Sequence, residues 1–95
     1  DNAAELMEAF WPHRPAQPWS GPVRFYALVC FATADKELWE TPCTQEGDWD
    51  NLGKQMGDVL QRCKFFENDR QITQGTVIKE WAKTDALIIE LWKLG

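Results

Sequence analysis

Three aspartates in this chain have the residue type and the spacing of a metal site. Asp48 and Asp50 lie two residues apart, and Asp69 follows nineteen residues after Asp50. Side chains two residues apart in an extended segment point to the same side. A helix of about 13 residues after Asp50 would span only about 20 Å, and the loop behind it is long enough to return Asp69 to the pair. We therefore expect three converging carboxylates. These are tolerated only when protonated or neutralised by a cation, and their oxygens suit Mg²⁺ or Mn²⁺.

A lysine follows this pair after one helical turn. Lys54 is four residues beyond Asp50, so one interpretation is a surface ion pair worth roughly 0.2–0.5 kcal/mol. The other is a cation beside a metal-bound phosphate, where it would stabilise the negative charge that develops in phosphoryl transfer. Asp50 also has a structural alternative, because aspartate is a preferred helix N-cap.

The remaining composition excludes several other kinds of site. The chain has one histidine, His13, and one serine, Ser20. A zinc site with two or more histidine ligands is therefore excluded, and a serine hydrolase would have to build its triad in a proline-rich loop. Three cysteines without a CxxC pair indicate neither a disulfide framework nor a zinc site. A calcium loop starting at Asp48 fails because Leu52 and Val59 occupy ligand positions.

The negative charge of the chain is concentrated in one segment. The net charge is −5, and residues 35–50 carry six acids and one base. A protein that simply coats nucleic acid should be basic. One interpretation is a solvated acidic loop, and the other is that Asp48 and Asp50 form a cation site. No apolar run approaches the roughly 20 residues of a membrane helix.

The periodicity predicts one small α/β or α+β domain with a mixed sheet packed with two helices. A first helix over residues 3–10, capped by Asp1 or Asn2, precedes a proline-rich connector. An apolar strand over residues 23–32, expected to be buried on both faces, leads into a loop over residues 33–47. The further elements expected are a helix at 51–63 with Asp50 as N-cap, a loop at 64–70, and strands at 72–81 and 86–92 joined by a hairpin turn at 83–85.

Two features of the second helix and its flanks bear on packing. Gly53 and Gly57 form a ridge that suggests close approach of a sheet or of a second subunit. Trp49 would face away from the two acids that flank it in an extended segment, so we expect it in the core. The tryptophans that could stack on unpaired bases, if exposed, are Trp11, Trp19 and Trp39.

These residues together resemble the RusA family of Holliday-junction resolvases. The family pattern is D-x-D-N-L-x-K, then D-x-L, then D-D-x-Q and a downstream V-x-K. The matching residues here are Asp48, Asp50, Asn51, Leu52, Lys54, Asp58, Leu60, Asp69, Gln71, Val77 and Lys79. Asn68 stands where the family has the first aspartate of D-D-x-Q, whereas the metal-binding position of that pair, the second, is Asp69. The resemblance extends over about residues 22–93 and is densest between Asp48 and Lys79.

The resemblance implies a small homodimeric endonuclease that needs Mg²⁺, with Mn²⁺ as an alternative, and cleaves four-way DNA junctions. Asp48, Asp50 and Asp69 correspond to the metal-binding catalytic acids, and Lys54 corresponds to the essential lysine. Lys54, Lys79 and Arg70 are the expected DNA contacts, although Lys79 could equally face water. A cytoplasmic protein of a bacterium or phage is implied as well.

Two departures from the family keep other functions open. The segment before Asp48 is acidic where the resolvases are rich in arginine, and the family's N-terminal strand is missing, so the chain could be truncated at its N-terminus. Phosphate contacts determine much of the affinity for DNA. The first alternative is therefore a catalytically inactive DNA-binding or partner-binding domain, and the second is a structural metal-binding domain without nucleic acid.

Overall fold

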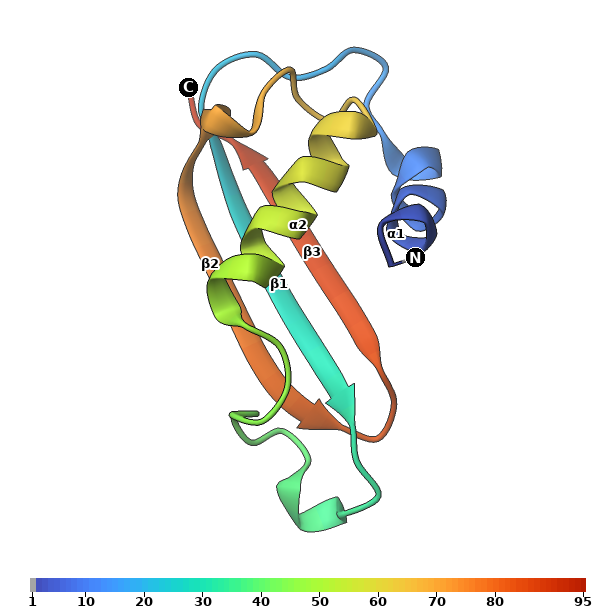
Figure 1. The fold of residues 1–95 in the computed structure, drawn as a ribbon. Coiled ribbons are helices and arrows are strands. Elements are labelled where there is room, and N and C mark those ends of the chain that lie inside the picture. Colours follow the sequence, from blue (N-terminus) through green and yellow to red (C-terminus); the bar gives the residue numbers. More distant parts are fainter. Residues whose placement is uncertain (1) are drawn as a thin grey trace.

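The computed structural model describes residues 2–95, which form a three-stranded sheet with two helices on one of its faces (Figure 1). This is the predicted α+β architecture. The predicted helix caps, Asp1 and the side chain of Asn2, lie outside the described part of the chain. In chain order the elements are α1 (Asn2–Phe10), η1 (Trp11–His13), β1 (Val23–Ala32), η2 (Lys36–Leu38), α2 (Trp49–Arg62), η3 (Asp69–Gln71), β2 (Ile72–Ala82) and β3 (Ala86–Lys93).

The strand order is β2-β1-β3, with β1 parallel to β2 and antiparallel to β3. The predicted mixed sheet is confirmed, but the predicted hairpin is wrong. Residues 83–85 instead cross the end of β1, where the Asp85 carboxylate accepts a hydrogen bond of 2.8 Å from the backbone N–H of Ala32. The most apolar strand takes the central position because there both of its edges are paired and it is best shielded.

The expectation that β1 is buried on both faces is wrong. Val23, Phe25 and Ala27 point toward the helices and are buried, whereas Tyr26 and Leu28 on the other face are only half-buried. Both helices lie on the same side of the sheet, so nothing in residues 2–95 covers the second face (Figure 1). An apolar run predicts a buried strand, but it does not tell which faces will be covered.

The core lies between α2 and the sheet. Its buried members are Val23, Phe25, Ala27, Met56, Leu60 and Phe66. The buried core residues on α2, Met56 and Leu60, lie four positions apart on one face of the helix, as the helical spacing predicts. The free thiols of Cys43 and Cys63 are buried outside this cluster.

Helix α2 starts two residues earlier than predicted, at Trp49, so the N-cap is Asp48 and not Asp50. The glycine ridge faces β2 in the same chain, from its first residue to its middle. A methyl group at Gly53 would lie 3.5 Å from Val77, and one at Gly57 would lie 3.5 Å from Ile72. These are ordinary packing distances, so the ridge serves packing against the sheet.

Within residues 2–95, no helix combines the length and the apolar character that crossing a membrane requires.

Candidate active site

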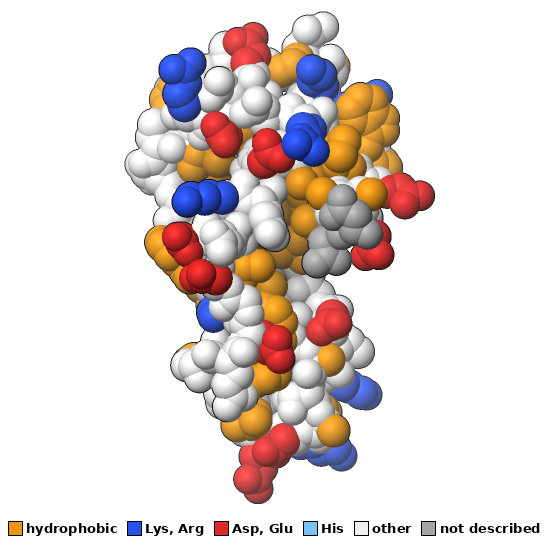
Figure 2. Space-filling view, viewed as in Figure 1, with side chains coloured by type: hydrophobic (Ala, Val, Ile, Leu, Met, Phe, Trp, Pro, Cys, Tyr) orange, Lys and Arg blue, Asp and Glu red, His pale blue; other side chains and the backbone are white. Residues whose placement is uncertain are grey.

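Asp48 and Asp50 meet where the loop after β1 enters α2. Asp48 is extended, with φ −101° and ψ 121°, whereas Asp50 lies in the first helical turn. The premise that both acids occupy one extended segment is therefore wrong, yet their carboxyl groups still come within hydrogen-bonding distance of each other. Asn51 donates a long hydrogen bond of 3.4 Å to Asp48. Acidic side chains gather at the start of α2, with hydrophobic atoms exposed beside them (Figure 2).

Asp48 holds a proton more readily than an isolated aspartate does. The hydrogen bond with Asp50, and then the negative charge of Asp50, raise the pKa of Asp48 above its ordinary value. The charges of Lys79 and Lys54 oppose this shift in the pKa. A divalent cation bound between Asp48 and Asp50 would offset the repulsion between their negative charges, because it brings two positive charges where a proton brings one.

Lys54 lies one turn along α2 and is exposed. The only ion pair within residues 2–95 joins Arg62 to Asp58, so the suggested surface pair between Asp50 and Lys54 does not form. Lys54 still acts on Asp48 through its charge. Its ammonium group is therefore near the acids without being neutralised by them.

Lys79 has a role that the sequence did not indicate. From β2 its ammonium group donates hydrogen bonds to the carbonyl oxygens of Glu46, at 2.9 Å, and Gly47, at 2.8 Å. Gly47 is the residue before Asp48 and has a φ of +67°, which glycine adopts without strain. Lys79 thus anchors the loop that leads to Asp48. The sequence did not indicate this role because the bonded residues, Glu46 and Gly47, are more than 30 positions away.

Asp69 does not join the carboxyl pair. It lies in η3, where its backbone N–H donates a hydrogen bond of 2.7 Å to the side chain of Gln61. Its Cβ lies 3.8 Å from the methyl position of Gly57. Gly57 is seven residues beyond Asp50, or about 10 Å along the helix axis.

The expected convergence of three carboxylates is therefore absent. Within the described residues, no group of three or more histidine, cysteine, aspartate or glutamate side chains is placed to hold a metal ion. The loop has the length to reach the pair, but η3 lies beside Gly57 and Gln61, about two to three turns further along α2. The donor set present is two adjacent carboxylates, and Mg²⁺ is often held by one or two carboxylates with water and substrate phosphate.

A comparison with protein families shows to which family the chain is related. The family model of endodeoxyribonuclease RusA matches residues 2–92. The chain belongs to the RusA family. A comparison with curated proteins gave no match. RusA-family membership makes this a domain of junction-resolving endonucleases.

The loop that carries the RusA-type D-x-Q motif is built around Gln71. Its side chain accepts hydrogen bonds from the backbone of Glu67 and Asn68 and donates to the carbonyl oxygens of Trp19 and Gly21. Gln71 therefore braces the loop. Arg70, an expected DNA contact, is exposed and turns its Nε back to Asn68 at 3.2 Å.

Trp49 is not in the core, contrary to expectation. It is 56% exposed, and its indole N–H donates a hydrogen bond of 2.9 Å to the carbonyl oxygen of Val77 on β2. Because α2 begins at this residue, its side chain follows the helical turn and not the alternation of a strand.

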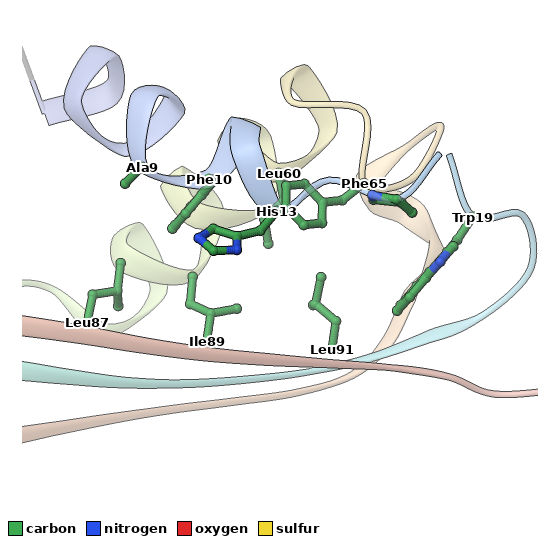
Figure 3. Close-up of a pocket in the computed structure, with 10 residues that line it drawn as sticks. Ala9, Phe10, His13, Trp19, Leu60, Phe65, Leu87, Ile89 and Leu91 are labelled. Carbon is green, nitrogen blue, oxygen red and sulfur yellow. The ribbon is translucent and has the colours of Figure 1, made fainter. Parts of the chain in front are cut away.

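An apolar cavity of about 460 Å³ lies away from these residues, between α1 and β3. The imidazole of His13 points into it, among Phe10, Leu60 and Ile89 (Figure 3). None of the predicted site residues lines this cavity.

Proposed function

We propose that this RusA-family domain is a Mg²⁺-dependent endonuclease that hydrolyses phosphodiester bonds in branched DNA, with the four-way junction as substrate. The observation that carries the proposal is the contact between the carboxyl groups of Asp48 and Asp50 at the start of α2. Two carboxylates in contact are destabilised as bare anions. Such a pair is useful when a cation is to be bound.

Asp48 and Asp50 would hold Mg²⁺, or Mn²⁺ in its place, with water and DNA phosphate as further ligands. When bound, the metal supplies an activated water and stabilises the departing oxygen. Lys54 stabilises the additional negative charge on the phosphate in the transition state, because its ammonium is exposed and unpaired within the described chain. Lys79 keeps the loop before Asp48 in position.

Asp69 corresponds to the third acid of the family, and its role as a ligand stays a proposal. In this structure its backbone N–H is bonded to the side chain of Gln61, and we propose that its carboxylate joins the site when metal and DNA are bound. Replacement of Asp69 by Asn tests this. A loss of cleavage as large as that of Asp50→Asn would support Asp69 as a ligand, and unchanged cleavage would restrict the metal site to the pair.

We further propose that the domain acts as a homodimer in the cytoplasm of a bacterium or in a phage-infected cell. A two-fold dimer would present two sites to a nearly two-fold junction. The open face of the sheet supports a self-contact, since it carries Tyr26, Leu28 and Ile88, the last 48% exposed. Light scattering at two protein concentrations measures the oligomeric state.

The test of the function uses an end-labelled four-way junction beside a linear duplex made from the same strands. Each is incubated with Mg²⁺, with EDTA and with the Asp50→Asn variant. Symmetric nicks in the junction that require Mg²⁺ and Asp50 are the expected result. Binding of the junction without cleavage would instead support the inactive DNA-binding alternative.

A further inference from the structure

The start of α2 carries an unusual aromatic surface. Trp49 is the most exposed of the large hydrophobic side chains described, ahead of Ile88 at 48% and Trp11 at 44%. It is the first residue of α2 and directly precedes Asp50 in the first helical turn. An indole exposed to this extent loses unfavourable contact with water when a flat apolar partner covers it.

The orientation of this indole is fixed. Its only hydrogen-bond donor, Nε1, is already used by the carbonyl oxygen of Val77 at 2.9 Å. The ring face therefore remains as the surface for contact, and little side-chain entropy is lost when a partner binds to a ring that is already oriented.

Other tryptophans in the protein have a cation over the ring. Arg14 lies 3.8 Å from the ring centre of Trp11, and Arg24 lies 4.2 Å from that of Trp92. No such cation lies over Trp49 in the part of the chain that the structure describes. Of the two exposed tryptophans, Trp11 and Trp49, only Trp49 has a ring without a cation over it in the described residues.

A hollow of about 210 Å³ lies directly beside this ring. Its walls are mostly apolar, and two charged site residues, Asp50 and Lys54, also line it. The lining consists of Phe25, Trp49, Asp50, Gly53, Lys54, Ile72, Gly75 and Val77. A flat apolar ligand with an attached anionic group matches this arrangement, since its ring would enter the hollow while its anion stays at Lys54.

We propose that this hollow is a nucleobase subsite, in which an unpaired base next to the cleaved phosphate stacks on Trp49. This inference rests on the proposed function, because it takes the DNA phosphate to lie at Asp48, Asp50 and Lys54. A nucleotide bound there has its own base, or that of its neighbour, within reach of Trp49. A base in a duplex has both faces stacked, so the subsite selects branch points where a base can leave the stack.

Photo-crosslinking tests the subsite without requiring cleavage. Four-way junctions carry 5-iodouracil at single positions around the branch point and are irradiated with the protein in EDTA. We expect one position to crosslink to the peptide that contains Trp49. Crosslinks that map only to other tryptophans would overturn the inference.

A second test measures the affinity of matched variants for the junction in EDTA. Trp49→Ala should weaken binding of the junction about tenfold, within the range measured for base–aromatic stacking. Trp49→Phe should retain most of the affinity, because the ring persists. Trp11→Ala removes another exposed indole and should have little effect. Equal losses in the two alanine variants would overturn the inference.

An abasic nucleotide at the crosslinked position completes a double-mutant cycle. If the base stacks on Trp49, the abasic junction and Trp49→Ala should together cost no more than either alone. Additive losses would overturn the subsite, as would a change of oligomeric state in Trp49→Ala, which would assign Trp49 to a subunit contact. Wild-type protein that crosslinks through Trp49 but does not cleave with Mg²⁺ would retain the subsite and refute the proposed function.

Discussion

The two ends of helix α2 face opposite physical requirements. At the N-terminal end Trp49 is 56% exposed, and two carboxyl groups are held in contact. At the other end Leu60 and Cys63 are 2% and 0% exposed and pack into the body of the domain. One helix thus has its buried packing contacts at one end and the exposed acidic groups of the site at the other. Variants at the two ends should therefore separate activity from stability.

The largest effect is expected from Lys54. Lys54→Ala removes the ammonium that opposes charge in the transition state, so cleavage should fall about 10²–10³-fold. Single-turnover rates with saturating protein measure this loss, and chemical denaturation should show little change. The control is Lys64→Ala, which removes an exposed lysine just beyond the other end of α2. Similar losses in both variants would mean that general charge, and not position, matters.

Leu60 should give the opposite result. Leu60→Ala leaves a cavity against β1 and should lower the free energy of unfolding by about 2–5 kcal/mol. Urea denaturation measures this, with Gln55→Ala on the exposed side of α2 as control. At a temperature where the variant remains folded, its cleavage rate should match the wild type. A slow rate in folded protein would show that the two ends are not independent.

Lys79 contacts the loop before the N-terminal end of α2. Its replacement should have an intermediate effect on cleavage. Lys79→Met removes the donor to Glu46 and Gly47 and one of the charges that lower the pKa of Asp48. Cleavage should fall about tenfold, and its pH profile should move to higher pH. The alternative from the sequence, a contact to DNA phosphate, would instead make binding less sensitive to salt. Salt titrations of junction affinity distinguish the two.

The smallest effect concerns pH and the metal-free protein. Because the pKa of Asp48 is raised in the folded state by Asp50, the folded protein holds this proton more tightly than the unfolded chain does. The stabilisation is therefore present at low pH and is lost as the pH rises through the folded pKa. Asp48→Asn should flatten the melting-temperature profile above about pH 4, where the carboxyl group ordinarily titrates. Identical profiles for the wild type and Asp48→Asn would contradict this prediction. The difference between the two profiles should become smaller as salt is added, because Asp48 is exposed.

The local elements of this fold were predictable because they follow from short-range patterns. The strand at Val23–Ala32 was placed as observed, and the other boundaries were within about two residues. The hairpin between β2 and β3 was wrong because turn residues report only on the local chain. The position of β1 between the two strands depends on pairing over long distances in the sequence.

The candidate site was predictable to a similar degree. The nearness of Asp48 and Asp50 followed from their spacing, although for the wrong backbone reason. The separation of Asp69 did not follow, because it depends on the bond from η3 to Gln61. The anchoring of Gly47 by Lys79 was missed for the same reason, because the two residues are 32 positions apart. The exposure of Trp49 was missed because α2 begins at this residue and not at Asn51.

The sheet order also has a consequence for how the chain folds. A three-residue connection such as 83–85 ordinarily closes a hairpin within about 1–10 μs and so gives a folding chain an early, local nucleus. Here β2 and β3 do not pair with each other, and each pairs only with β1. The first residue of β1, Val23, pairs with Ile72, which is 49 positions away. The domain has to search for its central pairings across half of its length, so it should refold slowly for its size, and its exposed strand edges should make dilute refolding conditions necessary.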